Sequence, residues 1–422
     1  MLFSILLYSL FNVTIVGVVH DASATDALID ITSPRVVARG PQRVIVALIE
    51  FPDMKHTTSS ALIRDIVFGQ LDSYYREVSY GLLSITGDIT DRWYQTHSPI
   101  SNLNLQEWVF DSNSMKQFER EAVESVKEHV GLEDYDFLII VAAGEVWPHA
   151  VCDFHVSVHD DHGLLRGIVV NEGASLGTYA HELGHVLPSN YQPRGGCGLP
   201  DLYSYDANKK AQDPNIFVGP WDIMGASNPP KHFSAWSKIE FGWITPAVIY
   251  PGATVSLPIT MEPLEKESGT RAIVIPLTET KSYVIEVRSH IGYDSNLPDE
   301  GILVYMIDSI KSDGDGPVRV ISRSPYPDDI YNAALKQGAF SAFPYSDVFV
   351  AVAYSHGLGY VAVSSGNSNG QSQKLPSSVT TDTISLFLAA GYAAEVQQVT
   401  QTSMRWVISA CPPSKSTLDR RH

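Results

Sequence analysis

The stretch Thr178-Tyr-Ala-His-Glu-Leu-Gly-His-Val-Leu187 contains one HExxH motif, His181-Glu-Leu-Gly-His185. Residues four apart on a helix lie one turn above each other, so His181 and His185 can direct two imidazole nitrogens at one metal ion. Glu182 would then lie beside the metal, where its carboxylate can take a proton from a metal-bound water. The motif therefore predicts a helix that carries a Zn²⁺ site and a general base.

Short HExxH matches also arise by chance on surface helices, so the surroundings of the motif matter. The residues that flank the two histidines are small or apolar, and Leu183 and Gly184 between them carry no charge, as expected for a helix buried behind a cleft. A predicted strand, Arg166–Asn171, precedes the motif and could form the upper rim of that cleft. Such a rim is expected when a substrate binds as an added strand.

Composition places the chain among folded proteins of about two domains. Of its 422 residues, 44% are hydrophobic and 18% are charged, which is typical of a folded globular protein. A chain of this length is too long for one ordinary hydrophobic core. The formal net charge of −18 argues against nucleic-acid partners and against binding to an anionic membrane surface, because both reward clustered Lys and Arg. The charge does not select a substrate.

The N-terminus has the pattern of a secretory signal peptide. Residues 2–19 are almost uninterruptedly apolar, and Asp21-Ala-Ser-Ala24 provides an A-x-A type cleavage site, although the usual Lys or Arg is missing before the apolar run. The alternative is an uncleaved anchor helix, for which the run is of borderline length. We expect residues 1–24 to be removed and the mature protein to be secreted, with no membrane association after cleavage.

Three cysteines, Cys152, Cys197 and Cys411, fit an exported chain with one disulfide. The preferred pair is Cys152 with Cys197, because both flank the predicted site, which leaves Cys411 unpaired in the tail. A metal-binding role is not favoured because the sequence has no CxxC spacing.

The first part of the chain alternates strands and helices. Apolar or β-branched runs predict strands, and helical spacing predicts helices, the last of which carries the motif from about Ala174 to Pro188. This pattern predicts an α/β (α+β) domain over residues 25–245. The predicted strands are Arg43–Phe51, Leu82–Thr86, Asp136–Ala143 and the edge-like Arg166–Asn171, and the predicted helices are Ser60–Val78, Ser114–His129 and Ala235–Phe241.

The second part has short strands separated by turns and predicts a mostly β domain over residues 246–363. Beyond it, residues 364–382 have the composition of a flexible linker, and residues 383–422 show no clear pattern, so 364–422 is interpreted as linker and unassigned tail. The predicted strands are Thr254–Pro258, Ala272–Pro276, Ser282–Arg288, Ile302–Ile307 and Phe349–Tyr354.

Two histidines do not complete a catalytic zinc site, which needs a third protein ligand and a position for water. A Gly-x-x-Asp turn, Gly198-Leu-Pro-Asp201, follows the motif after an apparent inserted loop, Pro188–Cys197. Asp201 is therefore the preferred third ligand. Glu240 and Asp222 are the alternatives.

Downstream, Val218-Gly-Pro-Trp-Asp-Ile-Met-Gly225 places Met224 in a glycine-flanked turn. A Met in a turn usually serves core packing, but in this order it predicts a polarizable floor beneath the metal-binding imidazoles.

Together these motifs resemble the M6 family of secreted metallopeptidases, the immune inhibitor A type, over roughly residues 40–363. The resemblance implies a zincin-like catalytic domain followed by a β-rich domain, export, and zinc-dependent endopeptidase activity on protein or peptide substrates. The segments that carry it are Val78-Ser-Tyr-Gly81, His181–His185, Gly198-Leu-Pro-Asp-Leu-Tyr203, Gly219-Pro-Trp-Asp-Ile-Met224, Ala235-Trp-Ser-Lys-Ile239 with Gly242-Trp243, Val284–Arg288, Tyr293–Pro298 and Gly301–Tyr305.

The chain departs from the family pattern in two places. The inserted loop interrupts the ligand turn, and little sequence separates the signal peptide from the first strand, where many relatives carry a long prosegment. The expected mechanism has His181, His185 and Asp201 as zinc ligands and Glu182 as general base, with Tyr203 an oxyanion candidate by proximity alone.

Two other clusters could bind metal but have simpler interpretations. His155, His159 and His162, with Asp160 and Asp161, could form a second site or a solvated loop near the cleft. Asp313-Gly-Asp315-Gly could bind Ca²⁺, but it lacks the terminal Glu of an EF-hand loop, so an acidic turn is the default.

Two further functions remain open from the sequence. One is a catalytically silent secreted binding protein with a zincin-like fold, which the interrupted ligand turn would favour. The other is a zinc hydrolase that acts on glycans or amides, since ligands alone do not define a substrate.

Overall fold

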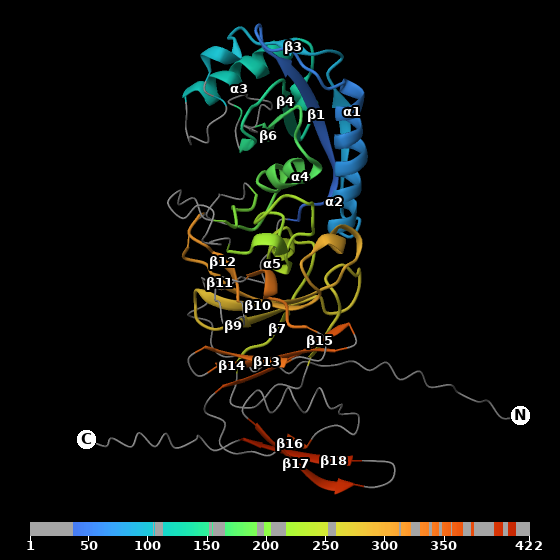
Figure 1. The fold of residues 1–422 in the computed structure, drawn as a ribbon, viewed down its shortest axis with the longest axis vertical. Helices are drawn as coiled ribbons and strands as arrows, with labels where there is room; N and C mark the ends of the chain where they lie inside the picture. The colour runs from blue at the N-terminus through green and yellow to red at the C-terminus, as the bar shows by residue number, and fades with distance from the viewer. Residues whose placement is uncertain are drawn as a thin grey trace, which may run out of the picture.

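The computed structural model describes residues 37–103, 105, 113–151, 154, 165–191, 198–203, 217–251, 259–311, 314–321, 330–336, 340–345, 348–355, 357–365, 373–374, 392–399 and 404–410. Within them the chain is a mixed α/β protein with several sheets and few helices (Figure 1). No helix in these ranges is long and apolar enough to cross a membrane.

A six-stranded sheet forms the upper part of the molecule in Figure 1, in the order β2-β1-β4-β6-β5 with β3 also paired to β1. Its pairs are parallel except β5 with β6, which are antiparallel. The sheet therefore ends in an antiparallel edge strand. The strands are β1 (Gly40–Glu50), β2 (Leu83–Ile89), β3 (Tyr94–Gln95), β4 (Phe137–Ala142), β5 (His149–Val151) and β6 (Arg166–Asn171).

Helices cover both faces of this sheet. Alternate residues of β1 pack against the helices near Ser60–Val78 and α4 on one face and against α3 on the other, which explains why β1 is an unbroken apolar run. The helices are α1 (Ser60–Asp65), the π-helix η1 (Ile66–Leu71), α2 (Asp72–Val78), α3 (Asn113–Val126), α4 (Leu176–Gly184) and α5 (Ala235–Glu240), with 3-10 turns η2 (Ile100–Asn102), η3 (Leu132–Asp134), η6 (Gly219–Trp221), η7 (Gly292–Asn296) and η8 (Ile330–Asn332).

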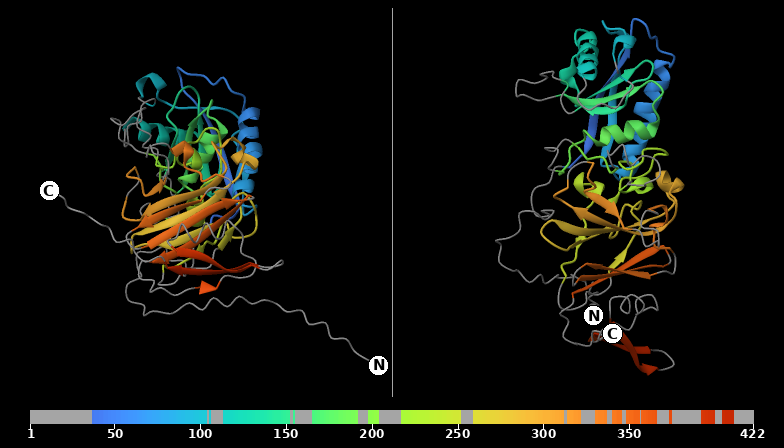
Figure 2. Two further views of the ribbon diagram at one scale, coloured as in Figure 1. Left: turned by 60° about the horizontal axis from the view of Figure 1, so that its bottom comes forward. Right: turned by 60° about the vertical axis from the view of Figure 1, so that its left-hand side comes forward.

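Two further sheets stack below α4 and α5, and a small third sheet follows them (Figures 1 and 2). The first has the order β12-β11-β10-β9-β7, the second β13-β14-β15-β8, and the third β16-β18-β17. Their strands are β7 (Ala247–Val248), β8 (Ile259–Met261), β9 (Ala272–Pro276), β10 (Lys281–Arg288), β11 (Gly301–Asp308), β12 (Val318–Val320), β13 (Phe340–Tyr345), β14 (Val348–Ser355), β15 (Leu358–Ser365), β16 (Gln373–Lys374), β17 (Tyr392–Val399) and β18 (Met404–Ala410).

One hydrophobic core connects the α/β part to the β-rich part. It contains Leu183 of α4, Met224, and Val284 and Leu303 from β10 and β11. A separate core lies between the five-stranded sheet that contains β10 and the four-stranded sheet that contains β14, and it includes Ile285 of β10. Strand β10 thus faces the metal-motif side with one set of side chains and the second sheet with the other.

Most predicted elements are confirmed within one to three residues at their ends, including the helix over Ser60–Val78 and the four strands predicted from Ala272 onwards. The interpretation of Arg166–Asn171 as an edge strand is wrong. It is β6, which pairs with β4 on one side and β5 on the other, so it is an interior strand.

Other predictions fall partly or wholly on residues that the structure does not describe. These are the signal peptide, the strand Thr254–Pro258 and most of the predicted linker. The tail, whose residues 383–422 showed no clear pattern, contains the antiparallel pair β17 and β18.

Candidate metal centre

The motif helix α4 begins and ends through local hydrogen bonds. Ser175 caps its N-terminus, because its side chain accepts a hydrogen bond from the backbone N–H of Thr178. The helix ends at Gly184, earlier than predicted, where the Gly184 carbonyl accepts the N–H of Leu199. His185 keeps helical backbone angles as the C-cap residue. Both histidines therefore lie one turn apart, as the motif predicts.

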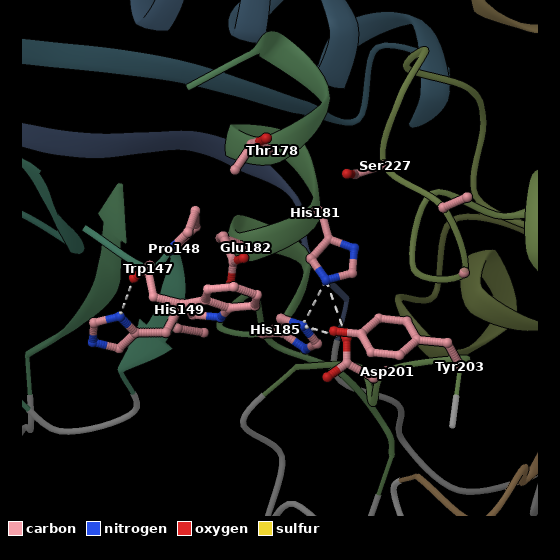
Figure 3. Close-up of a pocket in the computed structure, with 13 residues that line it drawn as sticks. Trp147, Pro148, His149, Thr178, His181, Glu182, His185, Asp201, Tyr203 and Ser227 are labelled. Atoms are coloured by element: carbon pink, nitrogen blue, oxygen red, sulfur yellow. Dashed lines mark hydrogen bonds and ion pairs between the residues drawn. The ribbon is translucent and has the colours of Figure 1, made fainter. Parts of the chain in front are cut away.

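Three side chains converge below this helix (Figure 3). The Nε2 atoms of His181 and His185 lie 3.1 Å apart, and Oδ1 of Asp201 lies 3.1 Å from the first and 3.2 Å from the second. In a tetrahedral zinc site with ligands about 2.0 Å from the ion, neighbouring donor atoms are about 3.3 Å apart. The spacing, donor types and burial of the three groups therefore fit a metal ion.

The far side of each imidazole is fixed by a backbone carbonyl. Nδ1 of His181 donates to the carbonyl of Ile223 at 2.9 Å, and Nδ1 of His185 donates to the carbonyl of Leu199 at 2.7 Å. These contacts place the proton on Nδ1 and leave Nε2 as a metal donor. Each histidine thus has the hydrogen-bond acceptor at Nδ1 that orients a metal-binding imidazole.

Gly198 brings Asp201 to the histidines. Its φ of +73° is in the left-handed region, and a Cβ there would lie 2.0 Å from the carbonyl carbon of His185. Only glycine allows the chain to pass this close beneath the motif helix. The Gly-x-x-Asp turn predicted from sequence is therefore in place, although residues 192–197 of the preceding inserted loop lie outside the described ranges.

The two alternative third ligands, Asp222 and Glu240, do not belong to the His-His-Asp group found among the described residues. The fully buried carboxylate of Asp222 accepts hydrogen bonds from the N–H of Met224 and from Ser234 and Ser237. Glu240 lies at the end of α5. Asp222 has a structural role in the turn rather than a place at the metal centre.

Met224 packs against the motif helix at Gly184, and its role as a floor beneath the imidazoles stays a prediction. Its side chain is fully buried, and a Cβ on Gly184 would be 2.8 Å from the Met224 sulfur. The Met224 carbonyl accepts the N–H of Leu202, the neighbour of Asp201. The turn therefore contacts both the histidine helix and the aspartate loop.

Glu182 lines the same cleft as the three candidate ligands and does not belong to their group. The cleft has a volume of about 380 Å³, and Glu182 is 8% exposed within it. The ring of Tyr203 stacks near His181, with centroids 6.2 Å apart. The remaining walls are Trp147, Pro148, His149, Ala150, Thr178, Gly225, Ala226 and Ser227.

Strand β5 and His149 are the features of the cleft that the sequence did not reveal. β5 is only three residues long and has no apolar run, so no periodicity marks it. Nε2 of His149 bonds Oε1 of Glu119 on α3 at 2.9 Å. Burial lowers the pKa of His149, but the hydrogen bonds to Glu119 and to the Trp147 carbonyl, together with the charges of Glu119 and Glu182, leave the pKa raised. No local pattern pairs positions so far apart in sequence.

Several predicted features lie outside the described residues. They are the three cysteines, and with them the predicted Cys152–Cys197 disulfide, the histidine patch from His155 to His162, and Asp313 of the acidic turn.

Metal binding should displace a proton from this site. Burial lowers the pKa of His181, but the hydrogen bond that the imidazole donates to Asp201 and the charges of Glu182 and Asp201 raise it to about 9. The metal-free imidazole is therefore protonated at pH 7, whereas a metal ligand must be neutral. We expect zinc binding at pH 7 to release about one proton and zinc affinity to rise with pH up to about 9.

Calorimetry of zinc binding in two buffers with different ionisation enthalpies measures this proton release. A binding enthalpy that is the same in both buffers at pH 7 would contradict it.

Comparison of the sequence with models of known protein families and with curated proteins found no match, so the site is interpreted from its own residues and geometry.

Proposed function

We propose that this protein is an exported zinc-dependent endopeptidase. The observation that carries the proposal is the convergence of His181, His185 and Asp201 beside Glu182, in a cleft bordered by an antiparallel edge strand. Zinc is the proposed metal because two imidazoles and one carboxylate are typical ligands of a catalytic zinc site. Export is proposed from residues 2–24, and the protein-like substrate also draws on the M6 family resemblance.

Glu182 would act as the general base and then the general acid. It would take a proton from the attacking water and deliver it to the leaving amine. Zinc, when bound, would supply Lewis acidity and lower the pKa of water towards about 7. His181 and His185 would hold the ion through Nε2, with their Nδ1–H groups already bound to carbonyls.

Strand β5 supports an extended peptide as the substrate. It is the last strand of its sheet in the part of the chain that the structure describes, and its residues His149 and Ala150 line the cleft together with Trp147 and Pro148, which precede it. An extended peptide can hydrogen-bond to the open side of such a strand and so pass beside Glu182. The rim predicted from sequence would thus be formed by β5 in place of β6.

A catalytically silent binding protein is the alternative. The sequence feature that favoured it was the interrupted Gly-x-x-Asp turn. Asp201 nevertheless lies within hydrogen-bond distance of both histidines, and the base Glu182 is retained. A fold without catalysis has no physical need for a base at this position.

The test combines metal content with cleavage of an unstructured protein. The full-length protein purified with zinc should contain one zinc per chain and should cleave casein at internal bonds. Zinc chelation should stop cleavage, and added zinc should restore it. One zinc per chain with no cleavage of casein or of a broad peptide library would favour the silent binding protein, and no bound zinc would refute the metal centre.

A further inference from the structure

The turn beneath the metal centre is attached to the β-rich part of the chain through Trp221. Its carbonyl accepts a hydrogen bond from Nη1 of Arg288 at 2.6 Å, and its indole N–H donates to the carbonyl of Ile330, also at 2.6 Å. Arg288 ends β10, and Ile330 begins η8. The residue immediately before Asp222 is therefore fixed from two positions in the β-rich region.

From Trp221 the contacts continue to two of the three candidate ligands, His181 and Asp201. Asp222 accepts the N–H of Met224 at 2.8 Å and so closes the turn. The carbonyl of Ile223 holds Nδ1 of His181, and the carbonyl of Met224 holds the N–H of Leu202 beside Asp201. A shift of this turn would move one imidazole and the aspartate loop together.

Arg288 uses its whole guanidinium group in this arrangement. Its side chain is fully buried, with Nε and Nη2 bound to Asp294 and Nη1 shared between Glu286 and the Trp221 carbonyl. Only arginine offers several donors in a fixed planar fork. Lysine would keep the positive charge but could not hold Asp294 and the Trp221 carbonyl in the same geometry.

We propose that Arg288 is a positioning residue for the metal centre: it holds the turn at Trp221 and thereby sets the affinity and geometry of the metal site. The β-rich region is then a structural part of that site rather than an independent module. This inference rests on the metal-binding part of the proposed function, and it does not depend on peptide cleavage.

The experiment measures metal binding by the full-length Arg288→Lys protein. Groups that hydrogen-bond metal ligands directly change affinity by about 10–100-fold when lost. Arg288 acts one link further away, so we expect the zinc dissociation constant, measured by competition with a chromophoric chelator, to rise by about 10-fold. The visible absorption bands of the Co²⁺-substituted protein should also shift, because they report ligand geometry.

Ile285→Ala is the matched control. Ile285 is buried on the same strand but packs into the core between the two β sheets, away from the turn. The control should lower thermal stability while leaving zinc affinity and the Co²⁺ spectrum unchanged. Equal shifts in Ile285→Ala and Arg288→Lys would show a general loss of stability and overturn the proposal.

Asp294→Asn decides the question if Arg288→Lys does not fold. Asp294 accepts hydrogen bonds from Nε and Nη2 of Arg288, and the amide keeps the size of the side chain but loses the charge that orients the guanidinium towards the Trp221 carbonyl, so weaker zinc binding with a shifted Co²⁺ spectrum is expected. Affinity and spectrum equal to wild type in the folded variant would overturn the proposal. A wild-type protein that binds no zinc would refute the metal centre itself, whereas normal zinc binding by both variants would refute only the role of Arg288.

Discussion

Glu182→Gln should leave one zinc bound per chain and lower the kcat for peptide cleavage by about 10²–10⁴-fold, the range expected when a general base is lost. The amide has nearly the shape of the carboxylate but cannot accept the proton. Because Glu182 is not part of the His-His-Asp group, zinc affinity should change little.

The measurements are zinc content and initial rates on casein and on a short fluorogenic peptide. Glu267→Gln, the same change at an exposed site in the β-rich region, is the control and should behave as wild type. Cleavage by purified Glu182→Gln at the wild-type rate would show that this mechanism is wrong.

Local sequence patterns were sufficient to predict an element where neighbouring residues alone define it. The strand β1 is buried on both faces and appears as a continuous apolar run, and the spacing of His181 and His185 requires a helix. The HExxH motif thus locates the cleft, the helix and the candidate base without any knowledge of the rest of the fold.

The same patterns could not predict the order of the strands within the sheet. A run of β-branched residues is compatible with an interior strand or a covered edge, so Arg166–Asn171 was misplaced at the edge. The true edge, His149–Val151, has no run to detect, and it is defined by pairing with β6. Strand order is a property of long-range contacts, which periodicity does not record.

The third ligand illustrates the same limit. Asp201, Asp222 and Glu240 were all open from the sequence, since each is a carboxylate near the motif. The structure distinguishes Asp201 from Asp222 through two contacts. Gly198 passes close beneath His185, which brings Asp201 to the histidines, and Ser234 and Ser237 hydrogen-bond the carboxylate of Asp222. Likewise, nothing in the sequence connects Arg288 to the turn at Trp221.

Asp201→Asn should weaken zinc binding more than the loss of any outer partner would, that is by more than about 100-fold. The amide keeps the size of the side chain but loses the charge that faces two imidazole nitrogens at 3.1 and 3.2 Å. Glu240→Gln, the same change at the rival carboxylate on α5, should bind zinc like wild type. Competition with a chromophoric chelator measures both affinities.

A second readout separates lost ligation from a damaged fold. Asp201 is also the group whose hydrogen bond raises the pKa of His181 in the metal-free protein. Without that charge the pKa of His181 should fall, so the residual zinc binding of Asp201→Asn should release fewer protons at pH 7 than zinc binding by the wild type. A protein that is merely misfolded would not show folded circular dichroism together with reduced proton release. If Asp201→Asn bound zinc normally and Glu240→Gln did not, the ligand would be Glu240, which does not belong to the His-His-Asp group here.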